Sequence, residues 1–140
     1  SQQAVSEFVF ALTKADGDST NLFSMHLRAA MGATDAATRT EELDAAAQVV
    51  ADAQASIQAV EVPGTNRVSG VKADSIIDAL GDAKEDCAER WGAIAKLVDI
   101  LRSPDGHTAD ELAELDEEAS NIVDIAIRLT TALTDSASYK

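Results

Sequence analysis

The chain has 140 residues, of which 46% are hydrophobic, enough for one domain with a single core and too few for two domains. It carries 25 acidic side chains against 11 basic ones, and its net charge is −14. A surface of that sign repels phosphate backbones and anionic lipids, so we expect no direct nucleic-acid binding and no membrane binding. Three explanations of the acidity remain: simple solvation, a halophilic-like composition adapted to high salt, and mimicry of a nucleic acid.

Cys87 is the only cysteine, so the chain has neither a disulfide framework nor a cysteine-rich zinc site. A single unpaired thiol is typical of a protein inside a cell or a virion. The chain has no run of 18 apolar residues, and its start lacks the basic and apolar regions of a signal peptide. We therefore expect a cytoplasmic protein, or one inside a virion.

Helices are favoured because aromatic residues make up only 4% of the chain and only two prolines occur. Residues 2–14 place apolar side chains on one helical face. Gly17 lies in a run of Asp, Ser and Thr and predicts a turn, after which residues 20–31 carry a second apolar face that ends at Gly32. The N-terminal segment is thus expected to form a pair of short helices.

A long helix is predicted over about residues 38–60, because Thr38 and Glu41 have the spacing of a capping box. Large and small apolar residues then alternate in a heptad seam, formed by Leu43, Ala46, Val50, Ala53, Ile57 and Val60. The irregular stretch 61–70 that follows is the best candidate for a mobile or functional loop.

The next predicted helix covers about residues 72–102 and is the longest. Its seam consists of Ile77, Leu80, Lys84, Cys87, Trp91, Ile94, Val98 and Leu101. Cys87 is interpreted as a small buried hydrophobe. Lys84 stands at a core-type position, from which its ammonium group is expected to reach solvent or a carboxylate. Gly81 and Gly92 weaken this helix, and we expect a bend or an interruption near either of them.

The last predicted helix covers about residues 109–134 and opens with a second capping box, Thr108 and Glu111. Its seam follows heptad spacing without interruption, through Leu112, Leu115, Ala119, Ile122, Ala126, Leu129 and Leu133. Val123, Ile125 and Ile127 widen the apolar stripe beyond a two-stranded seam. We expect this helix at the centre of a bundle or at a subunit interface.

The predicted fold class is therefore all-α. We expect one domain over residues 1–140, a four- or five-helix up-and-down antiparallel bundle. Three long helices (about 38–60, 72–102 and 109–134) would be joined by the shorter N-terminal helical pair.

Catalytic motifs are lacking. The two histidines, His26 and His107, stand in no Glu-x-x-His pair of the kind that di-iron bundles need, so both are interpreted as structural. The acidic run from Asp16 fails as a calcium loop, because its sixth and twelfth places hold Asn21 and Leu27. The chain also contains neither a phosphate-binding glycine loop nor a serine in a glycine elbow. No catalytic or cofactor-binding residue is predicted.

Carboxylates at helical spacing are the remaining chemical signal. Oxygen ligands from facing helices could hold Mg²⁺ or Mn²⁺ and activate water against a phosphoanhydride. The metal-ligand candidates are Glu41, Asp44, Glu111, Glu114 and Glu118. Asp86 and Glu89 have similar spacing. In all-helical nucleotide pyrophosphatases a Glu-x-x-Glu pair precedes a Glu-x-x-Asp pair; here the order is reversed, and no family is assigned.

The acidity is densest after residue 103, where nine acidic side chains stand against two basic ones. A partner with a basic patch would bind there, and the partner-binding candidates are Asp110, Glu114, Glu117, Glu118 and Ile125. The leading hypothesis is a non-enzymatic acidic interaction module that forms a homo-oligomer or binds a protein partner. The alternatives are a divalent-metal-dependent nucleotide pyrophosphohydrolase and an acidic nucleic-acid mimic that inhibits a DNA-binding protein.

Overall fold

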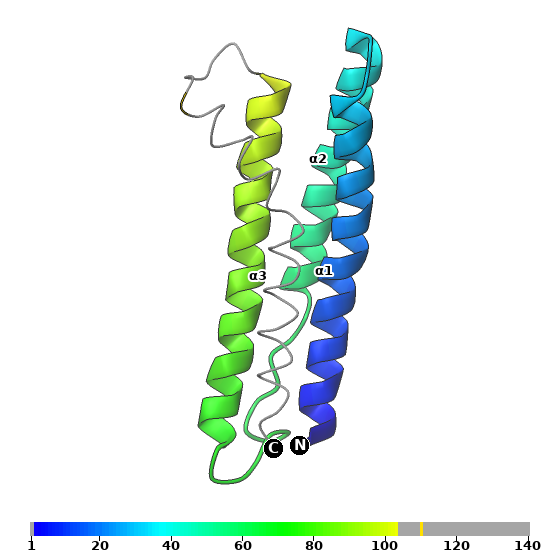
Figure 1. Cartoon of the computed structure of the whole chain (residues 1–140). Coiled ribbons are helices and arrows are strands. Elements are labelled where there is room, and N and C mark those ends of the chain that lie inside the picture. The colour runs from blue at the N-terminus through cyan, green and yellow to red at the C-terminus, as the bar shows by residue number, and fades with distance from the viewer. Residues whose placement is uncertain (1, 104–109, 111–140) are drawn as a thin grey trace.

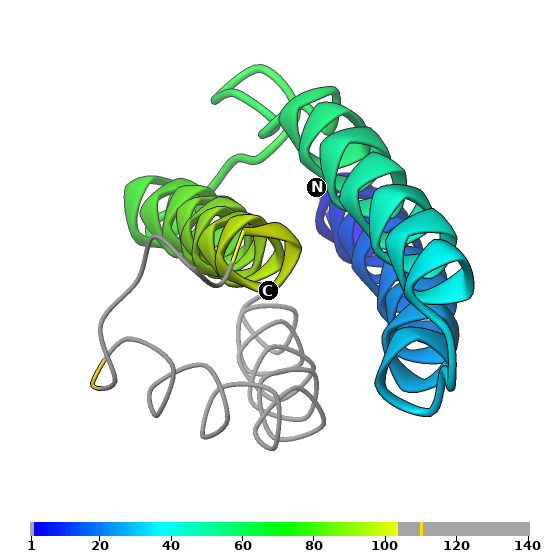
Figure 2. The same cartoon turned by 90° about the horizontal axis from the view of Figure 1, so that it is seen from above.

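The computed structural model describes residues 2–103 and residue 110. Within them it contains three helices, α1 (Gln2–Met31), α2 (Ala36–Gln58) and α3 (Ala73–Arg102). The helices run up, down and up, so α2 is antiparallel to both of the others (Figure 1). Seen from above, α1 and α2 lie as a pair with α3 beside them (Figure 2). The all-α class is confirmed for the described residues, whereas the predicted helix 109–134 lies outside them apart from Asp110.

The predicted N-terminal helical pair is wrong, because α1 is one helix of 30 residues that runs through Gly17. The polar side chains that suggested a turn form contacts within α1 or point into the core. Thr20 Oγ1 donates to the Asp16 carbonyl at 2.8 Å, one turn back in the same helix. Lys14 pairs with Asp18 at 2.8 Å, also one turn apart, and the Asp16 side chain is directed into the core. None of these groups is left to cap a helix end.

The start of α2 lies earlier than predicted. Asp35, not Thr38, is the N-cap: its Oδ1 accepts a hydrogen bond from the Thr38 backbone N–H at 3.3 Å. Thr38 is therefore already inside the first turn of the helix. The heptad seam of this helix is confirmed, since its first five members, Leu43 through Ile57, are all buried.

Helix α3 matches its predicted bounds and passes through Gly81 and Gly92 without interruption. Lys84 Nζ donates to the carbonyl oxygens of Gln58 (3.0 Å) and Val60 (2.6 Å) at the end of α2. This ammonium group, which was expected to reach solvent or a carboxylate, instead binds the free carbonyls of a neighbouring helix terminus.

The segment between α2 and α3 is anchored to the core. Val68 is buried, and its backbone N–H donates to the Gly64 carbonyl at 3.0 Å. Arg67 forms an ion pair with Glu7 of α1 at 2.6 Å, which lowers the pKa of that carboxyl. Gly70 has φ of +111°, a conformation that suits glycine, just before α3 begins. The loop that the sequence singled out thus closes one end of the helices.

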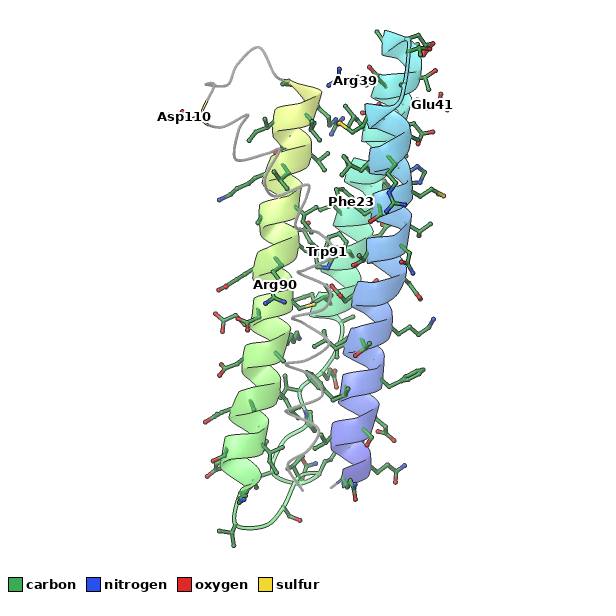
Figure 3. The ribbon with its side chains drawn as sticks, viewed as in Figure 1. Phe23, Arg39, Glu41, Arg90, Trp91 and Asp110 are labelled. Atoms are coloured by element: carbon green, nitrogen blue, oxygen red, sulfur yellow. The ribbon has the colours of Figure 1, made fainter. Side chains whose placement is uncertain are left out.

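A single core joins the three helices, and its largest side chain is Trp91 of α3. Phe23 of α1 meets the indole edge-to-face, with ring centroids 6.2 Å apart and an interplanar angle of 84°. Figure 3 shows the two rings pointing toward one another between α1 and α3. None of the described helices is long and apolar enough to cross a membrane.

Candidate functional site

A polar cluster lies inside the core, centred on Asp16. Its carboxylate Oδ1 accepts hydrogen bonds from Trp91 Nε1 (2.9 Å) and from the Cys87 thiol (3.6 Å). Asp16 is only 8% exposed. Burial raises the pKa of the Asp16 carboxyl, although the hydrogen bonds from Trp91 and Cys87 and the charge of Arg90 act in the opposite direction. The cluster joins α1 to α3.

The same environment makes Cys87 inert. Burial, followed by the neighbouring charge of Asp16, raises the pKa of the Cys87 thiol well above its ordinary value. A thiol attacks only as the thiolate, so this group lacks the electropositive, accessible setting of a nucleophile. The interpretation of Cys87 as a buried hydrophobe is confirmed, and its hydrogen bond to Asp16 is an addition to it.

Another polar contact involves a predicted structural histidine. His26 Nδ1 of α1 lies 2.8 Å from Glu42 Oε2 of α2, and both side chains are partly buried. This contact fixes α1 against α2 near the turn that joins them. His107 lies outside the described residues.

The metal-ligand candidates on α2 do not converge. Asp44 is tied to Arg102 of α3 at 2.8 Å, and Glu41 is exposed at the end of the helix (Figure 3). Asp44, Asp99 and Arg102 share a hollow of about 600 Å³ with Thr40, Leu43 and Ser103. Among the described residues, no group of three His, Cys, Asp or Glu side chains is arranged to hold a metal ion. Glu111, Glu114 and Glu118 lie outside them.

The partner-binding candidates also fall mostly beyond the described part of the chain. Asp110 is described and exposed. Glu114, Glu117, Glu118 and Ile125 lie outside. Asp86 and Glu89, the acidic pair on α3, are both exposed and belong to a longer acidic row. This row comprises six exposed carboxylates along the first 17 residues of α3: Asp74, Asp78, Asp82, Glu85, Asp86 and Glu89.

The outward face of α1 has the opposite character. Its positions 3, 6, 10, 13 and 17 repeat at intervals of three and four residues, on the side of the helix away from the buried Val5, Phe8 and Leu12. We name this surface the α1 outer stripe, defined by Gln3, Ser6, Phe10, Thr13, Lys14 and Gly17. None of these six residues is acidic, although the exposed acids Glu7 and Asp18 lie beside them on the same helix. Phe10 is 70% exposed at the centre of the stripe.

Sequence reasoning missed both the Asp16 cluster and the α1 outer stripe. The signal for the stripe was present in the chain, because Phe10 falls outside the apolar face formed by Val5, Phe8 and Leu12. The signal for Asp16 was masked by Gly17, which made its surroundings look like a turn. In the segment 20–31, expected to carry an apolar face, Leu22 (49% exposed) and Met31 (53% exposed) lie largely at the surface.

No known protein family matches this chain, and no curated protein or solved structure is significantly similar to it.

Proposed function

We propose that this chain is a non-enzymatic helical interaction module that self-associates or binds a protein partner. One observation supports the proposal: the α1 outer stripe carries a projecting phenylalanine on a molecule of net charge −14. Leaving a large aromatic side chain in water forfeits the free energy of burying it, about 1.5–3 kcal/mol. An adjoining partner surface would recover that free energy.

The proposal includes a four-helix bundle in which residues 109–134 supply the fourth helix. Lys84 and Arg102 mark the side of α3 that faces α2. Successive residues of a helix are about 100° apart, so Ala83 lies about 100° and Leu97 about 140° around α3 from that side. Both are nevertheless buried. This second buried side of α3 calls for its own covering surface. The wide apolar stripe from Leu112 to Leu133 is suited to provide one.

The direct test is the molecular mass in solution over a wide range of protein concentration. Sedimentation equilibrium is expected to show a mass that rises above the 14.7 kDa of one chain, or a stable complex with a cross-linked host protein. A chain that stays monomeric at the highest concentration, and that forms no specific complex, would contradict the proposal.

The metal-dependent pyrophosphohydrolase makes a different prediction. Because no group of three His, Cys, Asp or Glu side chains among the described residues is arranged to hold a metal ion, we expect no turnover of nucleoside triphosphates in Mg²⁺ or Mn²⁺, and no metal-induced rise in melting temperature. The assay measures released phosphate or pyrophosphate alongside thermal melts. Metal-dependent turnover that is lost in Asp44→Asn would establish the enzyme instead.

A second candidate function, the acidic nucleic-acid mimic, is favoured by the acidic row of α3. Its six carboxylates span 15 residue steps, or roughly 22 Å of helix, so that one charge falls about every 4–5 Å. A DNA strand presents one phosphate about every 3.4 Å, a similar linear density. The row therefore offers a basic DNA-binding surface a comparable target.

A competition assay tests the mimic. The chain is titrated into complexes of DNA with DNA-binding proteins from its host, and displacement of the DNA is measured. A double variant of the acidic row, Asp78→Lys with Asp82→Lys, should abolish displacement of the DNA. The matched double variant at exposed acids of α2, Glu41→Lys with Asp52→Lys, should leave displacement unchanged. Displacement that both double variants lose equally would indicate a general charge effect, not a mimic.

A further inference from the structure

We propose that the α1 outer stripe is the surface by which two copies of this chain associate, with their α1 helices antiparallel across a two-fold axis that passes beside Phe10. This inference rests on the proposed function and identifies both the surface and the partner. In a two-fold dimer the same patch is used on both subunits, so it must be complementary to itself. The stripe meets that condition in charge, in shape and in register.

Charge restricts where a second copy could bind. Each copy has a net charge of −14, and contact between like charges is unfavourable. Helix α3 presents its acidic row, and the exposed side of α2 presents Glu41, Asp44 and Asp52. The α1 outer stripe presents one base, Lys14, and the exposed acids beside it are Glu7 and Asp18, each in an ion pair with a base. Among the outward faces of the three described helices, this is the one that brings the fewest carboxylates into a contact between two copies.

Shape supports the same surface. Beside the projecting Phe10 ring lies a shallow apolar hollow of about 450 Å³, lined by Ser6, Val9, Phe10, Thr13 and Lys14. A two-fold axis beside this position directs the phenylalanine of each copy toward the hollow of the other. Both rings would then leave water in a reciprocal contact, and a buried aromatic anchor of this kind commonly dominates the binding free energy.

Register follows from two charged residues of α1: Lys14, which lines the hollow, and Glu7, which lies on the exposed side of the same helix. Glu7 and Lys14 are seven residues apart, about 10.5 Å along the helix axis. When two α1 helices run antiparallel about a point between residues 10 and 11, Lys14 of each copy comes level with Glu7 of the other. Two intermolecular ion pairs then flank the phenylalanines. The present partners of these residues, Arg67 and Asp18, form exposed pairs, which are weak and easily exchanged.

Close approach of the helices is possible because the stripe is otherwise small. Ser6, Thr13 and Gly17 flank Phe10, and no atom lies within 4 Å of the position that a side chain on Gly17 would occupy. The register limits the overlap to residues 2–19 of each copy, roughly 26 Å of helix. An interface of that size is at the small end of specific complexes, so we expect a reversible, concentration-dependent dimer.

The first test compares Phe10→Glu with Val71→Glu by sedimentation equilibrium of the full chain. Val71 is a fully exposed apolar residue in the loop before α3, away from the stripe, and serves as the matched control. Phe10→Glu should weaken the dimer at least tenfold, and Val71→Glu should leave it within about threefold of the original. Circular dichroism confirms that both variants are folded. Equal dimerisation of the two variants would overturn the inference.

The second test is a charge exchange that fixes the register. Lys14→Glu and Glu7→Lys should each weaken the dimer about tenfold, because each places two like-charged pairs across the axis. The double variant should restore the dimer to within about threefold. A double variant weaker than either single one would refute the antiparallel register.

The outcomes separate this inference from the proposed function. A dimer that persists unchanged in Phe10→Glu leaves the interaction module standing and assigns its surface elsewhere. A chain that is monomeric at every concentration removes both this dimer and the self-association on which it rests.

Discussion

Asp16 carries an ionisable group into a place where apolar side chains would ordinarily lie. Among residues 2–103 it is the one charged side chain that is buried. The indole N–H of Trp91 needs a partner when it is buried, and the Asp16 carboxylate supplies it. The cost of desolvating the carboxylate is visible in its raised pKa. The cluster therefore orients Trp91 at some expense in stability at neutral pH.

Replacement of this carboxylate by an amide should have a pH-dependent effect. The pKa of Asp16 is raised above its ordinary value of 3.8. The folded chain therefore binds this proton more tightly than the unfolded chain, which stabilises the fold below pH 3.8. That stabilisation is lost as the pH rises through the raised pKa. Asn at this position keeps an acceptor for Trp91 and does not titrate. The free energy of unfolding of Asp16→Asn, relative to the original chain, should therefore increase from pH 3 to pH 7.

Urea unfolding at several pH values measures this difference. Asp78→Asn, at an exposed acid of α3, controls for the loss of one negative charge. A relative stability of Asp16→Asn that falls as pH rises would show that the native carboxyl has a lowered pKa.

At the scale of elements, α1 shows how a helix continues through residues that individually favour a turn. Gly17 lies mid-helix, where glycine costs about 1 kcal/mol relative to alanine. The buried side chains on either side of it, Leu12, Asp16 and Phe23, all reach the core from one face. Packing of that face outweighs the local preference of one glycine.

Two substitutions of Gly17 report on this continuity. Gly17→Ala should stabilise the folded chain by about 0.5–1 kcal/mol, because no neighbouring atom opposes the added methyl group. Gly17→Pro should destabilise it by about 3 kcal/mol, because proline interrupts a helix interior. Thermal or urea unfolding at low protein concentration measures both. A tolerated proline would indicate a turn at this position.

The end of α2 is stabilised from α3, through Lys84. Lys84→Met keeps the aliphatic stem but loses the two hydrogen bonds to the carbonyls of Gln58 and Val60. The loss should be about 1 kcal/mol or somewhat more. Lys96→Met, at an exposed lysine of the same helix, is the matched control and should change stability by less than about 0.5 kcal/mol. Equal effects of the two variants would argue against a capping role.

At the scale of the whole molecule, the proposed fourth helix makes a prediction about stability. If residues 109–134 pack on the second buried side of α3, a polar residue in their seam should be costly. Ile122→Asn is expected to lower the free energy of unfolding by about 2–4 kcal/mol. Glu118→Gln, outside the seam, should have little effect. Unfolding followed by Trp91 fluorescence measures both, and an unchanged midpoint for Ile122→Asn would contradict the bundle.

The sequence alone was enough to predict the helices whose apolar pattern is long and regular. The seam of α2 from Leu43 to Ile57 and the bounds of α3 follow from heptad spacing, because side chains three and four positions apart share one face of a helix. The same pattern identified Cys87 and Trp91 as core residues. Composition and charge determined the all-α class and the strongly acidic surface.

Tertiary structure decided the features whose partners lie far away in the chain. Asp16 is buried because Trp91 and Cys87, more than 70 residues later, donate to it, and Lys84 binds carbonyls 24 and 26 residues earlier. Local sequence preferences involve residues within about one helical turn of each other. They therefore predict a turn at Gly17 and do not predict these distant contacts. The exposure of Phe10 was likewise decided by which face of α1 the other helices cover, and that face is where we place the second copy.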